Sequence, residues 1–205
     1  MSELLEQLKL RFGEHRVSIL PKEQDSEVEL IKINLELRLY PVTVIMTHGL
    51  CNYEMPVPNE QSNPHIELFA CLPSYWDWED LNNPKYAWPF EWLTKLSKHL
   101  IEKKTWFGAG HTFSNGTPPL PLSSSMKMEH LMLFEPILLE EHLSPLIVGD
   151  KTIHFLAVCP IFDDEFEYKR SKGTFKFLRK YRAKNNTELI DDFRQSVMKF
   201  KFGWF

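Results

Sequence analysis

The chain has 205 residues, 43% of them hydrophobic and 25% charged, which is typical of a folded globular protein and excludes a disordered one. This length suits one sizeable core or two small ones. No stretch approaches the ~18 apolar residues of a membrane span, and the acidic N-terminus lacks the positive charge and apolar core of a secretory signal. We therefore expect a cytoplasmic protein.

Charge is distributed unevenly along the chain. Residues 1–166 hold 13 Lys and Arg against 24 Asp and Glu, a balance of −11, whereas residues 167–205 hold 11 against 4, a balance of +7. This division indicates a basic face for nucleic acid, an acidic face for a basic partner, or an attraction of the two parts for each other within the fold.

The first half of the chain predicts one helix and three strands. Apolar residues at helical spacing over 2–15 predict an amphipathic helix, which Gly13 ends. Strict alternation over 31–39 predicts a strand with one buried face, and the β-branched run 42–46 predicts a buried strand. Alternation returns at 65–72 and predicts a third strand.

The next part of the chain predicts a helix and two further strands. Pro89 suits the first turn of a helix whose apolar stripe continues to Leu100. The Gly-, Pro- and Ser-rich stretch 106–125 is expected to be irregular. Apolar runs at 131–134 and 152–159 predict strands, the second of them central in its sheet.

The C-terminal part is helical in character. One helix is expected around Leu178, and a second helix is expected through Leu189, Phe193 and Val197, with Asn186 or Thr187 as its N-cap. This order of elements predicts one α/β (α+β-like) domain over residues 1–205, with a mixed β-sheet covered by helices.

Cysteine and histidine spacing predicts neither a disulfide framework nor a metal site. Cys51, Cys71 and Cys159 are odd in number, widely spaced and set in apolar stretches, so reduced, partly buried thiols are expected. His48 and Cys51 are three residues apart, but no second pair of ligands has matching spacing. The glycines form no phosphate-binding loop. We expect no metal and no cofactor.

A small hydrolase is one functional alternative. Cys51 lies near His48, and Ser114 lies near His111, so that each nucleophile has a base close in sequence. Sequence neighbours of this kind are common by chance, because catalytic triads are usually assembled from distant segments. The chain has no Gly-x-Ser-x-Gly nucleophile elbow.

Nucleic-acid binding through the basic segment 169–184 is a further alternative. Cations and aromatic residues interleave there, as they do on surfaces that contact phosphates and stack bases. The other interpretation is a solvated helix whose aromatic residues face the core. The residues concerned are Phe175, Lys176, Phe177, Arg179, Lys180, Tyr181, Arg182 and Lys184.

Five motifs, taken in order, make the chain similar to the bacterial branch of the Suppressor-of-fused-like (SUFU) domain family. Four are Thr47-His48-Gly49-Leu50, Glu67-Leu68 leading to Leu72-Pro73 and Trp76, Trp88-Pro89, and Gly110-His111-Thr112 followed by Asn115-Gly116 and Pro118. The fifth is the strand 153–159 running into Pro160-Ile161, Glu165 and Gly173. The recognisable part covers about residues 30–200. Cys51 and the pair Phe113-Ser114 depart from the family's pattern.

The resemblance implies a protein that binds another protein and is not an enzyme. Animal members hold a transcription factor, and bacterial members are associated with neutralising polymorphic toxins as immunity proteins. The motif residues are then structural: Gly49, Gly110 and Gly116 supply special backbone conformations, and His111 is expected to form hydrogen bonds within its loop. No membrane, nucleic acid or small-molecule substrate is expected as the partner.

An aromatic and acidic segment is the candidate contact for that partner. Asp77, Trp78, Glu79 and Asp80 combine an interface-type aromatic anchor with charges that would steer a basic target. The neighbouring Trp76 matches the family's aromatic position and is expected in the core. An open edge of the sheet is the second candidate contact.

Overall fold

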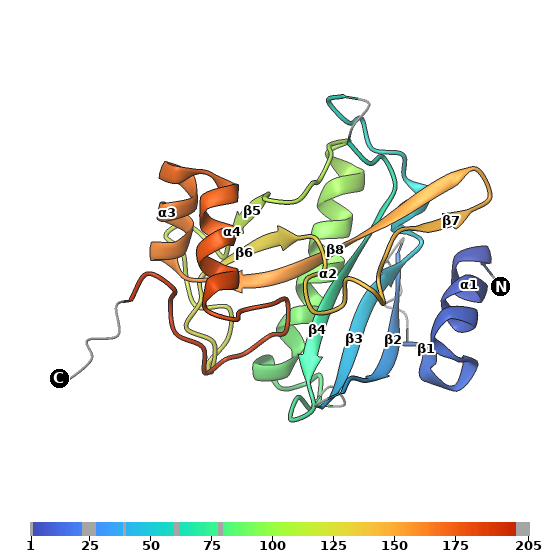
Figure 1. Ribbon diagram of the computed structural model, residues 1–205, viewed down its shortest axis with the longest axis horizontal. Coiled ribbons are helices and arrows are strands. Elements are labelled where there is room, and N and C mark those ends of the chain that lie inside the picture. Colours follow the sequence, from blue (N-terminus) through green and yellow to red (C-terminus); the bar gives the residue numbers. More distant parts are fainter. Residues whose placement is uncertain (1, 22–27, 39, 60–61, 78–79, 200–205) are drawn as a thin grey trace.

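The computed structural model describes residues 2–21, 28–38, 40–59, 62–77 and 80–199 (Figure 1). In this part of the chain a mixed sheet has the order β1-β2-β3-β4-β8-β6-β5, and β7 pairs with β8 beside that path. The strands are β1 Val17–Ile19, β2 Glu29–Glu36, β3 Pro41–His48, β4 Ile66–Pro73, β5 Thr112–Ser114, β6 His130–Phe134, β7 Leu146–Val148 and β8 Lys151–Ile161. The helices are α1 Glu3–Phe12, α2 Pro84–Glu102, α3 Asp163–Lys172 and α4 Thr174–Ala183, with short 3-10 turns η1 Glu14–Arg16 and η2 Leu50–Asn52.

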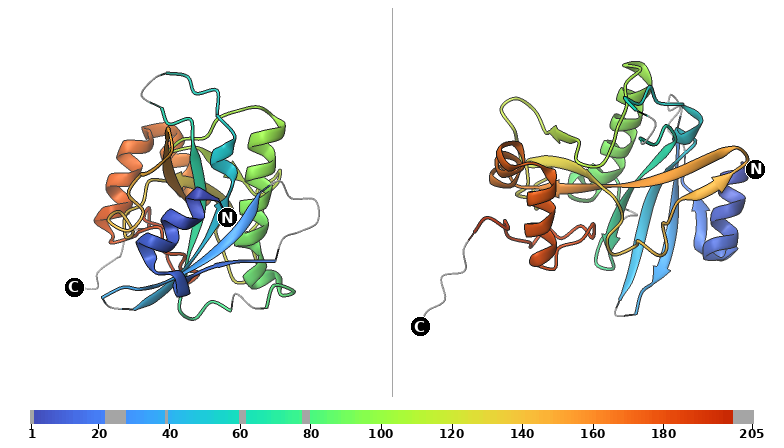
Figure 2. Two further views of the ribbon diagram at one scale, coloured as in Figure 1. Left: turned by 90° about the vertical axis from the view of Figure 1, so that its right-hand side faces the viewer. Right: turned by 45° about the horizontal axis from the view of Figure 1, so that its top comes forward.

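The sheet separates two hydrophobic layers. One face is covered by α2, whose Trp92, Leu93 and Leu96 are buried. The other face packs against α1 and α4, which lie at opposite ends of the molecule (Figures 1 and 2). This arrangement confirms the predicted α/β domain with a mixed sheet covered by helices.

The N-terminal helix and the first strands follow the predicted pattern. The Ser2 hydroxyl caps α1 by accepting the Leu5 N–H at 3.2 Å, and Gly13 ends the helix with a φ of 97°. Ile31 and Ile33 of β2 are buried, as the alternation indicates, although β2 ends at Glu36; Leu39 lies outside the described residues.

The strand β4 is buried along its whole length. It pairs antiparallel with β3 and parallel with β8, so both of its edges are occupied, and both sheet faces are covered. The alternation at 65–72 therefore marks a central strand, and it places the side chain of Glu67 inside the protein with no solvent exposure.

The start of α2 differs from the prediction. The helix begins at Pro84, and the Asn83 side chain caps it by accepting the Lys85 N–H at 3.1 Å. Pro89 lies inside the helix. Because it has no N–H, the carbonyl of Lys85 in the first turn loses its helical hydrogen bond, and the helix continues past it. Pro84, rather than Pro89, therefore occupies the first helical position.

The predicted last helix is also wrong. Residues 184–199 are turns and bridges, in which Leu189 pairs with Cys71 and the Ile190 N–H donates to the Cys71 carbonyl at 2.9 Å. Phe193 is 79% exposed and so belongs to no buried helical stripe. The three-residue strands β1, β5 and β7 were not predicted either, because so short a run has no readable periodicity.

Candidate binding pocket

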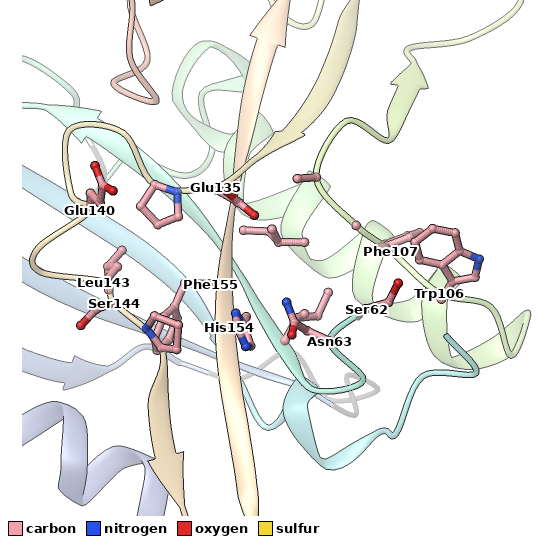
Figure 3. A pocket seen from close by; sticks show the side chains of 16 residues that line it. Ser62, Asn63, Trp106, Phe107, Glu135, Glu140, Leu143, Ser144, His154 and Phe155 are labelled. Carbon is pink, nitrogen blue, oxygen red and sulfur yellow. The ribbon is translucent and has the colours of Figure 1, made fainter. Parts of the chain in front are cut away.

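A pocket of about 670 Å³ opens where the sheet splits along one edge of β8 (Figure 3). The β6 ladder ends at Ala157 and the β7 ladder ends at Ile153, so Phe155 has no strand partner on this side. The connecting segment 135–145, here called the 135–145 loop, leaves the sheet between Pro136 and Pro145. A proline has no N–H to extend a ladder, which explains why the pairing stops there.

The pocket is acidic. Its titratable residues are Glu135, Glu140 and His154, and among the described residues no Lys or Arg lines it. Both glutamates are exposed, and neither has a hydrogen-bond or ion-pair partner among the described residues. Burial lowers the pKa of His154, which keeps that ring neutral at pH 7 despite the opposing effect of Glu135. Two carboxylates thus face the pocket without compensation.

An aromatic wall completes the pocket. Trp106 lies against Gly108, where an added Cβ would come within 2.9 Å of the indole ring and would force the ring to shift. The indole also meets the His111 ring edge-on, with centroids 4.4 Å apart. Next to it, the Phe107 N–H contacts the Met55 sulfur at 3.3 Å. The remaining lining residues are Ser62, Asn63, Ile66, Ala109, Leu143, Ser144 and Leu156.

The 135–145 loop is anchored at both ends. The buried carboxylate of Glu188 accepts the backbone N–H groups of Ile137, Leu138 and Leu139 at 3.0, 2.8 and 2.7 Å. At the other end, Arg11 of α1 donates to the Ser144 carbonyl at 2.7 Å. These contacts all lie within the chain, so the pocket forms without a bound partner.

Several of the motif residues meet in one buried cluster behind the pocket. The Glu67 carboxylate accepts the Thr47 hydroxyl at 2.5 Å and the N–H groups of Gly49 and Cys51 at 3.0 and 3.1 Å. Burial raises the pKa of Glu67 to about 7, and these hydrogen bonds only partly oppose the rise. Gly49 has a φ of 105°, and Leu50 begins the turn η2 and is buried.

The Gly110-His111 motif lies on the connection between α2 and β5, where this connection contacts α4. Gly110 has a φ of 92°, and a Cβ there would come within 2.7 Å of the Thr174 hydroxyl of α4. The His111 N–H donates to the Gly108 carbonyl at 3.1 Å, while its ring packs on Trp106 and forms no hydrogen bond among the described residues. The expected hydrogen bond of His111 within its loop is therefore not made by its side chain, which packs on aromatic rings instead.

The other motif residues support the ends of elements. The Asn115 amide donates to the Leu120 and Pro121 carbonyls at 3.1 and 2.9 Å in the β5–β6 connection, which contains Gly116 and Pro118. Pro73 ends β4, and Trp88 and Pro89 are buried in α2. Trp76 is buried, as expected, and its indole N–H donates to the Tyr86 carbonyl at 3.2 Å.

The acidic partner-binding candidates lie apart from the pocket. Asp77 is exposed and Asp80 is half-buried, whereas Trp78 and Glu79 lie outside the described residues. This loop follows β4, and the pocket borders the first residue of β4, Ile66, so about 23 Å of strand separates them at ~3.3 Å per residue. One small contact cannot cover both.

The proposed nucleophile pairs are not assembled as expected. His48 bonds to Glu29 at 3.1 Å and to the Ser2 hydroxyl, while burial and the Glu67 carboxylate raise the pKa of the Cys51 thiol, which leaves it protonated. His48 and Cys51 therefore form no catalytic dyad.

Ser114 instead meets a different histidine. Its hydroxyl lies 2.9 Å from His130 Nδ1, and His130 Nε2 lies 3.0 Å from Asp163. Asp163 is 63% exposed, and none of these three residues lines the pocket. The His130 ring stacks on Phe166 with centroids 4.3 Å apart, so this chain of hydrogen bonds ties β5, β6 and α3 together.

The described residues hold neither a metal-binding cluster nor a helix that could span a membrane. No group of three or more His, Cys, Asp or Glu residues in the described ranges could hold a metal ion. Among the helices that can be described, none is long and apolar enough to cross a membrane. The three cysteines are free and buried, as expected.

The chain is thus an α/β domain with an acidic pocket at a split in its sheet. The chain belongs to the Suppressor of fused protein (SUFU) family, whose model matches residues 25–195. This match confirms the family resemblance that the sequence motifs indicate. No curated protein sequence matches the chain.

Solved structures of the same family share the fold. A SUFU homologue from Neisseria gonorrhoeae FA 1090 superposes with a TM-score of 0.68 at 14% identity, covering 97% of both chains. The crystal structure of a Sufu–Fu complex gives 0.68 at 15% identity, covering 95% of this chain and 90% of that one. Drosophila Suppressor of Fused gives 0.60 at 16% identity, and there the match covers 84% of this chain but 43% of the fly chain.

Proposed function

We propose that this chain is a non-enzymatic immunity protein that neutralises a toxin encoded nearby by direct, stoichiometric binding in the cytoplasm. The observation that carries the proposal is the pocket, which is lined by the unpaired Glu135 and Glu140 and by the aromatic ring of Trp106. Pockets that combine a rigid aromatic surface with a few polar groups are suited to anchoring a partner.

The family supports the choice of a protein as the partner. A Sufu protein has been crystallised in complex with Fu, and a bacterial SUFU homologue shares the fold over nearly the full length of this chain. We propose that the same fold, taken as one domain over residues 1–205, serves protein binding here. The two carboxylates favour a partner segment that presents a Lys or Arg side chain, which could also stack on the indole ring.

The test is co-expression with the neighbouring toxin, combined with measurement of the affinity of the purified pair. Glu135→Lys and Glu140→Lys should each weaken binding at least tenfold and reduce protection, because they replace attraction by repulsion. Glu141→Lys is the matched control, since Glu141 is also exposed but does not line the pocket. Unchanged affinity in both pocket variants would contradict the proposed contact.

The loop with Asp77, Trp78, Glu79 and Asp80 remains a second proposed contact. It is supported by an exposed aromatic pair beside it, Tyr75 and Phe193, whose rings are 6.0 Å apart. Trp78→Ala should weaken toxin binding by about 2 kcal/mol or more if this loop is the anchor. Because the loop and the pocket lie at opposite ends of β4, a loss in one set of variants and not in the other identifies the contact.

A hydrolase is the second candidate function, and the hydrogen-bonded chain Ser114–His130–Asp163 is the observation that favours it. If the protein acts by binding alone, Ser114→Ala should protect cells as well as the wild type does, and a serine-directed fluorophosphonate probe should not label the protein. Loss of protection in Ser114→Ala with unchanged toxin affinity would instead establish catalysis.

A further inference from the structure

The helices α3 and α4 form a hairpin with a large unpaired positive charge, here called the basic hairpin (residues 163–184). Seven of its cations lie in no ion pair with any described carboxylate: Lys169, Lys172, Lys176, Arg179, Lys180, Arg182 and Lys184. Arg170 is paired, with Glu167 at 2.7 Å. The two helices lie side by side at the end of the molecule remote from α1 (Figures 1 and 2).

Within the hairpin, Lys180 lies over the Tyr168 ring at 5.3 Å and joins α4 to α3, but the hairpin cations form no ion pair with described residues outside the hairpin. Of the ion pairs between described residues, Arg194–Glu165 is the one that joins the basic C-terminal part to residues 1–166. Among the described residues, ion pairing between the acidic residues 1–166 and the basic residues 167–205 is thus confined to Arg194, which lies outside the hairpin. Lys176, Arg179 and Arg182 of the hairpin are exposed and unpaired among the described residues, so they are available to a ligand outside the chain.

The cations on α4 follow a regular spacing. Lys176, Arg179 and Arg182 are exposed and three residues apart, which corresponds to about 4.5 Å along the helix axis. The phosphates of one nucleic-acid strand follow each other at ~3.4 Å along a duplex axis, and somewhat further apart when the strand is stretched. A row of cations at this interval can follow a phosphate backbone.

One aromatic residue is exposed among these cations. Phe177 and Tyr181 face the core, as a solvated helix requires, but Phe175 is 78% exposed beside Lys176. An exposed ring flanked by cations is the arrangement that stacks an unpaired base. An amphipathic membrane helix needs a broad apolar face, and the apolar face of α4 is already buried.

We propose that the basic hairpin binds single-stranded nucleic acid, with Lys176, Arg179 and Arg182 along the backbone and Phe175 stacked on a base. This inference is independent of the toxin-binding proposal, because the pocket and the hairpin residues do not overlap.

The test measures the anisotropy of a labelled oligothymidylate mixed with the full chain between ~50 and ~200 mM salt. We expect binding that weakens as salt rises. Arg179→Gln combined with Arg182→Gln should reduce the slope of log affinity against log salt by about 1.4, since each contact on a single strand contributes ~0.7. Phe175→Ala should weaken binding at least about fivefold and leave the slope unchanged, because stacking involves no counterions.

Lys98→Gln combined with Lys103→Gln is the matched control, because it removes two exposed cations at the C-terminal end of α2, of which Lys103 is the C-cap. This variant should bind like the wild type. The proposal is overturned if no salt-dependent binding occurs at ~50 mM salt. It is also overturned if the α2 control loses as much affinity as the hairpin variant, or if poly-glutamate or phosphatidylserine vesicles bind the hairpin as tightly as the oligonucleotide does.

Discussion

The Glu188 carboxylate, on the segment after α4, accepts the N–H of Leu139 at 2.7 Å and so joins two segments 49 residues apart. The same carboxylate accepts the two preceding N–H groups, and all three amides belong to the loop that walls the pocket. The conformation of the pocket wall therefore depends on Glu188, which does not line the pocket itself.

Removing this anchor should loosen the loop. Glu188→Ala leaves three backbone N–H groups without their acceptor, and we expect it to lower the free energy of unfolding by about 3 kcal/mol or more. Glu188→Gln should cost roughly half as much, because one acceptor oxygen remains. Amide hydrogen exchange should quicken at 137–139 in both variants. Exchange as slow as in the wild type would show that other contacts hold the loop.

The buried carboxyl of Glu67 should make stability depend on pH. Its pKa is about 7 in the folded protein against an ordinary 4.5, so between these values the folded state holds a proton that the unfolded chain has released. Raising the pH through this window therefore favours unfolding, by up to about 3 kcal/mol. Denaturant unfolding at several pH values should show this loss in the wild type and in Glu36→Gln, an exposed control, but not in Glu67→Gln.

The Arg194–Glu165 pair is buried and bidentate, with N–O distances of 2.6 and 2.7 Å. Arg194→Met leaves a fully buried carboxylate without its cation and should destabilise the protein by about 3–5 kcal/mol. Arg194→Lys keeps the charge but not the two parallel hydrogen bonds, and should cost less.

Arg170→Met serves as the control for Arg194, because Arg170 pairs with Glu167 at a similar distance on the surface. Its loss should be below ~1 kcal/mol. Equal losses for the two methionine variants, measured by denaturant unfolding, would mean that burial does not govern these pairs.

Gly110 and Gly173 allow a steric effect to be separated from backbone strain. Both have positive φ angles, of 92° and 86°, but a Cβ meets Thr174 at Gly110 and nothing within 4 Å at Gly173. Gly173→Ala should therefore cost about 1–3 kcal/mol from strain alone, because its φ of 86° and ψ of 159° are nearly restricted to glycine. Gly110→Ala should cost clearly more, because α4 must also shift. Thermal unfolding of the two variants compares them directly, and equal losses would show that Thr174 moves aside freely.

Much of the fold could be predicted from local patterns. Hydrophobic periodicity is enough to locate a buried face. It predicted the strands at 31–39 and 42–46 and the apolar stripe of α1. The motif residues Thr47, Gly49 and Glu67 were found from their order, although their convergence on one carboxylate was not foreseen. Where tertiary contacts replaced local ones, as at Leu189 pairing with Cys71, the predicted helix was wrong.

The sequence by itself determined the family, the strand-forming segments and the basic composition of residues 169–184, because motif order, periodicity and charge are properties of neighbours along the chain. Only the tertiary structure decided that Glu135, Glu140 and Trp106 share one pocket and that Phe175 faces outward. The pocket exists because the β6 and β7 ladders stop at different points along β8, next to Pro136 and Pro145. Residues 62–66, 106–109 and 135–145 then surround the gap between the two ladders. Such closure depends on the packing of the whole sheet, which no local pattern encodes.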